Sequence, residues 1–362
     1  MSHALLWFRR DLRMTDNPAL QAALRECDQV TPLYIHAPEE EAPWAPGSAS
    51  RWWLDLSLEA LHNQLQRLGS RLLIQAGPSL ETLQRLVAKE SVTHLFWNRV
   101  YEPKLVSRDT HIEQVLSESG VACHSFSGSL LNEPWEILNK SGKPFRVFTP
   151  FWRSCRQRVS GIEPPLLAPA RLPPVKIKEP GLSFDSLNLR PRIAWDMSLH
   201  ESWTPGEAGA LKRLRDFLRD TVTDYQQARD LPGVCGVSRL SPHLHFGEIG
   251  PRQIVHAIWS AGGDEPPTEE SGGEGYLRQL GWREFAHYQL YHFPQTDLSP
   301  LDERFQRFPW TTADDNRHGW TAWRQGRTGI PLVDAGMREL WHTGWMHNRV
   351  RMIVASLLTK NL

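Results

Sequence analysis

Two helical patterns in the second half of the chain carry polar and aromatic side chains at regular spacing. Tyr276, Gln279 and Trp282 lie three residues apart, which places them on one side of a helix, and Asn348 and Met352 lie one turn apart on another. An amide donates and accepts hydrogen bonds, and an indole can hold a flat ring against its face. By themselves these spacings indicate only polar residues near aromatic ones, because many single tryptophans belong to a core.

Hydroxyl groups stand where a shorter helix is expected to begin. Ser238 and Ser241 precede Pro242, a residue that suits the first turn of a helix. Hydroxyl and backbone N–H groups at such a position can bind phosphate, although capping is the commoner role of serine there. Lys and Arg also outnumber Asp and Glu from residue 275 onward, which predicts a modest basic surface.

The first part of the chain predicts the sheet that must support these helices. Short apolar runs alternate with helical patterns, which is typical of an α/β domain with a doubly wound parallel sheet. The runs cover residues 4–8, 30–37, 71–76, 94–97 and 122–126. Residues 9–13 after the first run contain neither a Gly-x-Gly-x-x-Gly pattern nor a Walker lysine, so the familiar phosphate loops for NAD and ATP are excluded.

Prolines divide the chain into domains. They are frequent in residues 160–205, which indicates a connection, and helical patterns dominate afterwards. We therefore expect an α/β domain over 1–130, a connection over 131–205 and an all-α domain over 206–362. The Gly-rich residues 262–275 are expected to form an exposed loop.

Composition excludes several classes of protein. The 362 residues are 40% hydrophobic and 23% charged, as in globular proteins, and 41 basic residues balance 41 acidic ones. No apolar run reaches the length of a membrane span. The four cysteines lack zinc-ligand or redox spacing, which predicts buried reduced thiols, no metal site and a cytoplasmic protein. The 16 tryptophans exceed the 6 tyrosines and 13 phenylalanines.

Several long strings resemble the DNA photolyase and cryptochrome family. They are LLWFRRDLR at 5–13, FRVFTPF at 145–151, SRLSP at 238–242, WREF at 282–285 and TGWMHNRVRM at 343–352, and the likeness is colinear from residue 4 to residue 362. The resemblance implies an α/β domain that can hold an antenna pigment and a helical domain that binds FAD. It implies a monomeric carbon–carbon lyase that uses light to repair cyclobutane pyrimidine dimers flipped out of DNA.

The same resemblance assigns roles to individual residues. FAD binding is implied for Tyr225, Val237, Ser238, Arg239, Leu240, Ser241, Tyr276, Arg283 and Arg351. Contact with DNA or the dimer is implied for Arg229, Gln279, Trp282, Asn348, Arg349 and Met352, with Gln279 and Trp282 at the catalytic centre. Asn98, Tyr101 and Glu102 match the antenna side, where methenyltetrahydrofolate is expected and a deazaflavin is the alternative. Trp310 is the candidate outer member of a tryptophan chain that reduces the flavin.

Gln279 departs from the family's pattern. Repair enzymes for cyclobutane dimers usually carry Glu there, and Gln can make the same hydrogen bonds but supplies no charge or proton. A Gln at this position also resembles the pattern of (6-4) photolyases. Asn348, Arg349 and Met352 match the pattern of cyclobutane-dimer photolyases instead. Because this second motif is longer, we give it more weight. A (6-4) photolyase and a cryptochrome-like photoreceptor remain alternatives.

The resemblance also implies a longer protein. Family members continue beyond the position of Leu362, and the remaining part holds the inner tryptophans and much of the flavin pocket. We therefore expect a truncated domain that binds FAD weakly or not at all and is inactive. An alternative of another class is a non-catalytic α/β module with an unfinished helical domain.

Overall fold

Five parallel strands form the predicted sheet in the computed structural model, which describes residues 2–159, 161–263, 267–311 and 314–361. The strands are β1 (His3–Phe8), β2 (Gln29–His36), β3 (Leu73–Ala76), β4 (His94–Asn98) and β5 (Ala122–Phe126). Their order is β3-β2-β1-β4-β5, so the order reverses between β1 and β4. In doubly wound sheets this reversal opens a crevice at the carboxyl ends of the strands, where ligands bind. The predicted fold class is confirmed.

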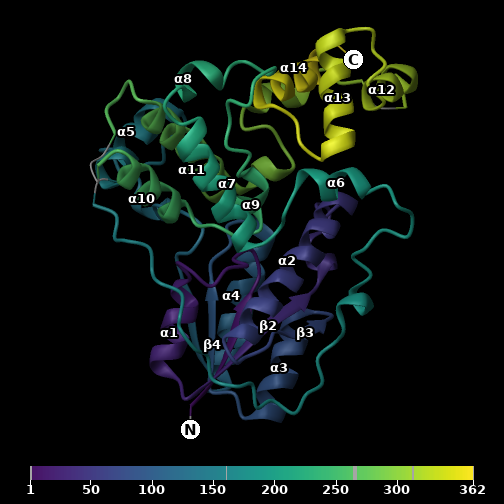
Figure 1. Cartoon of the computed structure of the whole chain (residues 1–362). Coiled ribbons are helices and arrows are strands. Elements are labelled where there is room, and N and C mark those ends of the chain that lie inside the picture. The colour runs from purple at the N-terminus through teal and green to yellow at the C-terminus, as the bar shows by residue number, and fades with distance from the viewer. Residues whose placement is uncertain (1, 160, 264–266, 312–313, 362) are drawn as a thin grey trace.

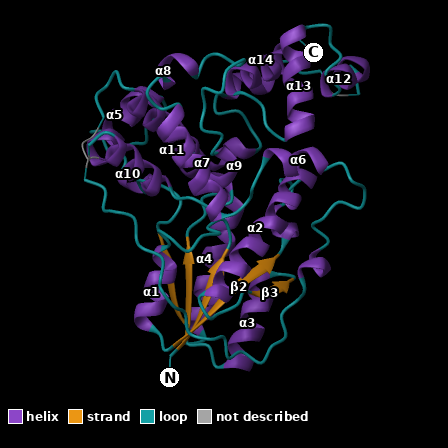
Figure 2. Cartoon of the chain, viewed as in Figure 1, coloured by secondary structure: helices purple, strands orange, loops and turns teal. Residues whose placement is uncertain are grey.

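Helices cover both faces of the sheet (Figure 2). They are α1 (Pro18–Glu26), α2 (Ser48–Arg67), α3 (Ser79–Glu90) and α4 (Pro103–Glu118), with a 3-10 turn, η1, at Pro38–Glu41. Side chains of the central strand alternate between the two cores. Ala4, Leu6 and Phe8 pack with residues of α1 and α2, whereas Leu5 and Trp7 pack with residues of α3 and α4. A strand buried on both faces reads as a continuous apolar run, as the sequence does here.

The first turn of α1 is capped by a side chain. The side chain of Asn17 accepts a hydrogen bond from the backbone N–H of Leu20 at 3.1 Å, and Pro18 occupies the first position of the helix. The cap satisfies a backbone donor that the helix itself leaves unpaired.

A second, helical part lies beyond the carboxyl ends of the strands (Figure 1). Its helices are α5 (Phe148–Val159), α6 (Met197–Ser202), α7 (Glu207–Asp220), α8 (Tyr225–Ala228), α9 (Ser241–His245), α10 (Pro251–Ala261), α11 (Gly272–His292), α12 (Arg317–Arg324), α13 (Pro331–Thr343) and α14 (Asn348–Lys360). Short 3-10 turns lie at Pro134–Glu136 (η2), Phe184–Leu187 (η3), Pro294–Asp297 (η4) and Glu303–Arg307 (η5). No helix within the described residues is long and apolar enough to cross a lipid bilayer.

Two segments differ from the sequence-based expectation. Residues 148–159 lie inside the expected connection, yet they form α5, which packs against α11. The expected loop over 262–275 is wrong at its end, because α11 already begins at Gly272, while residues 264–266 lie outside the described residues. A Cβ at Gly272 would lie 1.7 Å from the carbonyl oxygen of Val222, so glycine permits this close helix contact.

The expectation of buried cysteines holds only in part. Cys155 is buried, Cys27 and Cys123 are partly buried, and Cys235 is exposed. All four are free thiols. Cys235 lies in the loop between α8 and α9, where the chain crosses the surface and has no core to enter.

A buried polar cluster joins the two parts of the molecule. The Glu248 carboxylate, which is fully buried, accepts hydrogen bonds from Trp53 Nε1 at 2.9 Å and from the backbone N–H of Gly206 at 2.7 Å. It also accepts one from the Ser57 hydroxyl and pairs with His243 Nδ1. Because Trp53 and Ser57 belong to α2 and His243 to α9, this carboxylate fixes α2 of the α/β part to the helical part.

Candidate functional site

A cavity of about 1220 Å³ lies where the carboxyl ends of the strands meet the helical part. Its walls come from α2, α9, α11, the start of α14 and the segments that follow β1 and β4. The position agrees with the crevice expected from the strand order. The cavity is larger than most small-molecule sites, so it has room for a dinucleotide.

The cavity collects almost all of the candidate residues from the sequence. Those that line it are Tyr101, Glu102, Tyr225, Arg229, Val237, Ser238, Arg239, Leu240, Ser241, Tyr276, Gln279, Trp282, Arg283, Asn348, Arg349, Arg351 and Met352. Asn98 and Trp310 do not line it. Residues separated by more than 200 positions in the sequence thus share one site.

Helix α11 supplies one wall. Tyr276, Gln279 and Trp282 all line the cavity, as their spacing of three residues predicts. The Tyr276 hydroxyl is 2.7 Å from Ser238 Oγ, which links α11 to the segment before α9. Burial raises the pKa of Tyr276, so this phenol stays protonated and the link persists at neutral pH.

Trp282 forms the rim of this wall. Its indole is stacked on the ring of Phe148, with the ring centroids 3.7 Å apart and the planes at 10°. Phe148 is buried, whereas Trp282 is 47% exposed. The Gln279 amide nitrogen lies 3.5 Å from the carbonyl oxygen of Gly275, which is a weak contact. The rim therefore presents an open aromatic surface beside an amide with hydrogen-bonding capacity to spare.

The segment before α9 supplies a second wall. Arg239 has a φ of 53°, a left-handed conformation that is uncommon for a residue with a side chain. Its guanidinium carbon lies 4.3 Å from the centroid of the Trp345 ring. The backbone N–H of Leu240 donates to Ser238 Oγ at 3.3 Å. This compact turn brings a hydroxyl, a cation and an indole to the same side of the cavity.

Positive charge predominates in the cavity lining. The arginines are Arg10, Arg229, Arg239, Arg283, Arg349 and Arg351, and the acidic residues are Glu102 and Asp230. Burial lowers the pKa of Arg283, whose guanidinium donates to the carbonyl oxygen of Ser129 at 2.7 Å. Its pKa in water is so high that it still carries its charge at neutral pH. A cavity with this lining favours an anionic ligand.

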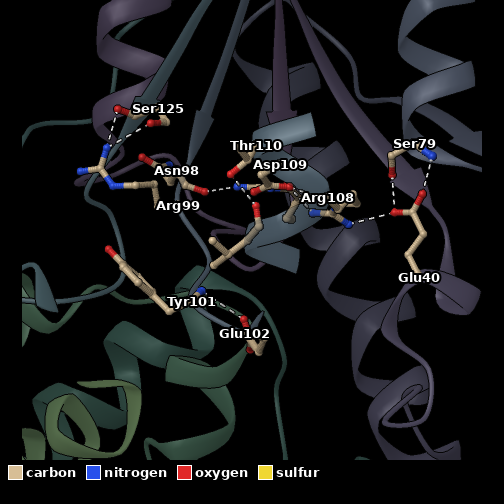
Figure 3. Close-up of polar contacts among 12 residues, drawn as sticks. Glu40, Ser79, Asn98, Arg99, Tyr101, Glu102, Arg108, Asp109, Thr110 and Ser125 are labelled. Atoms are coloured by element: carbon tan, nitrogen blue, oxygen red, sulfur yellow. Dashed lines mark hydrogen bonds and ion pairs between the residues drawn. The ribbon is translucent and has the colours of Figure 1, made fainter. Parts of the chain in front are cut away.

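Tyr101 and Glu102 meet the cavity from the α/β side (Figure 3). The Tyr101 hydroxyl donates to the Glu133 carboxylate at 2.9 Å. Burial disfavours the Glu102 carboxylate, but the ion pair with Arg10, backbone hydrogen bonds and His287 together outweigh that effect and lower the pKa of Glu102. Glu102 is therefore ionised and held in place by a cation.

Asn98, by contrast, is part of the sheet's support. Its amide nitrogen donates to Asp11 Oδ2 at 2.6 Å and to Asn17 Oδ1 at 2.8 Å, and the residue is buried. These hydrogen bonds tie the end of β4 to the cap of α1. The structure thus places Asn98 apart from Tyr101 and Glu102, with which the sequence grouped it.

Trp310 also lies away from the cavity. It is 52% exposed, its indole nitrogen donates to the carbonyl oxygen of Phe305 at 2.9 Å, and its ring centroid lies 4.6 Å from that of Phe308. Residues 312–313 beside it lie outside the described residues. Its contacts with the described residues do not connect it to the cavity.

Sequence reasoning missed an aromatic wall and two histidines. Trp52, Trp53, Trp203 and Trp345 line the cavity, and so do His245 and His287. The tryptophan content was the signal for the indoles, but it did not indicate which of them share a site. Burial, together with nearby arginines, lowers the pKa of each histidine to about 4, so both are neutral at physiological pH.

These residues fit FAD. The cofactor presents flat aromatic rings, hydroxyl groups and an anionic pyrophosphate, and the cavity offers indoles, hydroxyls and arginines in one enclosure of sufficient volume. Among the described residues, no group of three or more His, Cys, Asp or Glu is arranged to hold a metal ion.

Comparison with known proteins agrees with this site. Residues 4–173 match the family model for DNA photolyase, and residues 276–362 match that for the FAD binding domain of DNA photolyase. The chain is 38% identical to a deoxyribodipyrimidine photo-lyase of Agrobacterium fabrum over 99% of its length, and it spans 73% of that protein. It is also 38% identical to cryptochrome-1 of Arabidopsis thaliana over 99% of its length, but it spans only 53% of that protein.

Solved structures show the same likeness. A bacterial class III photolyase from Agrobacterium tumefaciens superposes with a TM-score of 0.91 at 37% identity, covering 99% of this chain and 72% of that one. A Synechocystis cryptochrome gives a TM-score of 0.87 at 27% identity, covering 100% of this chain and 75% of that one. Because family models match both halves of the chain, and its fold and sequence match those of photolyases and cryptochromes over nearly its whole length, the chain belongs to the DNA photolyase and cryptochrome family.

Proposed function

We propose that this protein uses FAD and light to repair cyclobutane pyrimidine dimers in DNA. The observation that carries the proposal is the setting of Trp282, a half-exposed indole that is supported from behind by Phe148 at the rim of a cationic cavity. A base that leaves the duplex needs a flat aromatic surface on which to stack. Arg229 and Arg349 line the same cavity and can pair with DNA phosphates.

The flavin site is assigned to the wall made by α11 and the segment before α9. Residues that would hold FAD are Tyr225, Val237, Ser238, Arg239, Leu240, Ser241, Tyr276, Arg283 and Arg351. Bound FAD would absorb the light and supply the electron that splits the dimer. The hydrogen bond between Ser238 and Tyr276 keeps the two sides of this wall together, and the arginines balance the charge of the pyrophosphate.

The dimer site is assigned to the rim. The Gln279 amide can donate to a base carbonyl and accept from a base N–H at the same time. Asn348 offers a second amide, and Met352 an apolar thioether that adapts to the shape of its neighbour. Trp282 would hold the dimer by its flat face.

The first test is retention of FAD. The purified chain is incubated with FAD and desalted, and its visible absorption spectrum is recorded. A bound-flavin spectrum supports the proposal and contradicts the expectation from the sequence that the chain binds FAD weakly or not at all. A melting temperature that rises with FAD concentration also supports the proposal. No flavin spectrum and no thermal shift at any FAD concentration would overturn it.

The second test is repair itself. An oligonucleotide that contains one cyclobutane dimer is incubated with the reduced, FAD-loaded protein in blue light and in the dark. Loss of the dimer in light only is the expected result. A protein that retains FAD but leaves the dimer intact would support the alternative of a cryptochrome-like photoreceptor.

Gln279 is the observation that favours this alternative. It replaces the carboxylic acid that repair enzymes usually carry at this position, and the chain is 40% identical to cryptochrome-2 of Arabidopsis thaliana. The Gln279→Glu variant separates the two functions. If the amide is what prevents repair, the variant repairs dimers in light although the wild type does not. A (6-4) photolyase would instead act on an oligonucleotide with a (6-4) photoproduct.

We also propose that Tyr101 and Glu102 face a folate antenna, since both line the cavity on the α/β side. Asn98 is left out of this assignment because its amide is used within the fold. Methenyltetrahydrofolate added to the FAD-loaded protein is expected to give a new absorption band that survives desalting. Glu102→Gln is expected to weaken that band, and a deazaflavin that binds in place of the folate would contradict the choice of pigment.

A further inference from the structure

A buried histidine lies next to the residues assigned to the dimer, yet the proposed sites do not use it. His347 is 2% exposed and immediately precedes α14, whose first residues Asn348 and Arg349 line the cavity. His347 itself does not line the cavity. Because burying a polar ring is costly unless the fold uses its nitrogens, the contacts of this ring indicate its role.

One nitrogen of this ring caps α14. His347 Nδ1 accepts a hydrogen bond from the backbone N–H of Arg349 at 3.1 Å, and the backbone of His347 is not helical, with φ at −56° and ψ at 136°. The residues that usually fill this role are Asn, Asp, Ser and Thr. Since the accepting nitrogen carries no proton, the neutral ring carries its proton on Nε2.

The other nitrogen has no comparable partner. His347 Nε2 is buried and forms no hydrogen bond with another of the described residues. The backbone carbonyl of Arg229, at the end of α8, is close enough to favour a proton on the ring. Asp230, the next residue, pairs with Arg349 at 2.7 Å. His347 therefore lies where the start of α14 meets the end of α8.

The surroundings keep this histidine neutral at physiological pH. Burial lowers the pKa of His347, and the nearby Arg349 guanidinium lowers it further. The carboxylates of Glu339, on α13, and Asp230, after α8, oppose the shift, as does the carbonyl of Arg229. The neutral ring keeps the lone pair that caps the helix, whereas a proton on Nδ1 would remove that acceptor.

The cap affects the side chains of the first turn of α14. The first N–H groups of a helix have no partner within the helix, so a turn that loses its side-chain acceptor frays more easily. Asn348 occupies the first position of α14 and lines the cavity. Met352 lies one turn further on and is less exposed to fraying. The direction of the Asn348 amide thus depends on the cap.

We infer that His347 is a positioning residue for the dimer site, because its unprotonated Nδ1 fixes the first turn of α14 and with it the direction of the Asn348 amide. The inference rests on the proposed function in that the dimer is the group that this amide contacts. A cap with only a structural role would change stability alone. A positioning residue also changes the preference for dimer-containing DNA over undamaged DNA.

Two substitutions separate the nitrogens of the ring. His347→Asn places an amide oxygen near the position of Nδ1 and keeps the cap, whereas the longer side chain of His347→Gln reaches toward the position of Nε2 and loses it. Anisotropy with dimer-containing and undamaged oligonucleotides gives the preference as a ratio of affinities. His347→Gln is expected to lower this ratio about threefold to tenfold, the effect of a lost helix cap on an equilibrium constant. His347→Asn is expected to retain most of it.

A pH profile and a second cap complete the test. In the wild type the preference is expected to fall as acid protonates Nδ1, whereas His347→Asn keeps a constant preference over the same range. The matched control is Asn316→Ala, which removes the side-chain cap of α12, a hydrogen bond from the backbone N–H of Gly319 at 3.2 Å. Asn316 does not line the cavity, so this variant is expected to lower the melting temperature and leave the preference unchanged.

The outcomes separate this inference from the proposed function. A folded His347→Gln variant with the preference of the wild type would overturn the inference, as would equal losses in the Gln and Asn variants. If His347→Gln does not fold, the pH profiles of the wild type and His347→Asn decide. A wild type without any preference for dimers loses the proposed function, and hydrogen exchange at the Arg349 N–H then decides the inference. Slow exchange in the wild type and His347→Asn, with fast exchange in His347→Gln, keeps it, and equal exchange in all three overturns it.

Discussion

At the scale of single residues, the most informative side chain is Trp282. One face of its indole rests on Phe148, and the residue is nearly half exposed, so the other face is available. A stacking surface of this kind contributes to binding without a charge and therefore depends little on salt. Binding through the surrounding arginines, by contrast, weakens as the salt concentration rises.

Trp282→Ala is expected to weaken binding of dimer-containing DNA by about 1–3 kcal/mol, the usual value of one base–aromatic stack. Anisotropy with dimer-containing and undamaged oligonucleotides measures the change. The control is Trp341→Ala, since Trp341 is 83% exposed on α13 and does not line the cavity. Equal losses in the two variants would contradict the role assigned to Trp282.

The protonation of Glu284 is expected to make the stability of the protein depend on pH. Its carboxylate is buried and accepts hydrogen bonds from the backbone N–H groups of Leu131 and Asn132, at 2.9 and 3.1 Å. Burial raises the pKa of Glu284 to about 7, although Arg283 opposes the shift. In the unfolded chain the pKa of a glutamate is about 4.3.

The folded state thus holds the Glu284 proton more tightly than the unfolded state. Its stabilising contribution is fully present below the unfolded pKa and is lost as the pH rises through about 7. Relative to Glu284→Gln, the wild type is expected to lose on the order of 3 kcal/mol of unfolding free energy across this range. Denaturant unfolding of both proteins at several pH values tests this, and parallel stability profiles would contradict it.

At the scale of elements, the strands were predictable and the start of α11 was not. The runs of β1, β2 and β4 are short, rich in residues that favour strands and mostly buried, so composition identifies them, whereas β5 at the edge of the sheet is only partly buried. Residues 262–275 look like a loop because glycines lower helix propensity. These glycines are required by tertiary contacts. Gly272 lies against Val222, in the segment before α8, and Gly275 lies against the Gln226 side chain, and neither position has room for a side chain.

The candidate site shows the same division. Spacing alone placed Tyr276, Gln279 and Trp282 on one face of a helix, and the family motifs supplied their roles. The sequence could not indicate that Trp52 and Trp53 reach the cavity, because α2 packs on the sheet and its indoles read as core. It also could not reveal that the fold itself uses the amide of Asn98.

Gly272→Ala is expected to destabilise the protein by about 2 kcal/mol or more, because the new methyl group meets the carbonyl of Val222 and displaces the start of α11. Thermal unfolding measures the loss. The matched control is Gly233→Ala, where a Cβ has no neighbour within 4 Å and φ is not in the left-handed region. A similar small effect at both positions would show that α11 can shift at little cost.

At the scale of the whole molecule, the Glu248 cluster is expected to couple the unfolding of the α/β part to that of the helical part, because its hydrogen bonds join α2 to α9 and to the start of α7. Glu248→Leu is expected to leave the donors of Trp53 and Gly206 unpaired and to cost about 3–5 kcal/mol. Limited proteolysis then cuts the helical part before the sheet. Glu248→Gln retains an acceptor for both donors and is expected to be milder. A single unfolding transition of unchanged midpoint in Glu248→Leu would contradict this account.

The residues that line the cavity extend from Arg10 to Met352, so the cavity can form only after most of the chain has been translated. All five strands are complete by Phe126, and the ribosome needs tens of seconds to make the residues that separate them from α14. During that interval a nascent chain can assemble its sheet but has no pocket to offer a cofactor. Loading must therefore follow the emergence of the last lining residues, and until then the indoles of α2 are surfaces that chaperones can bind.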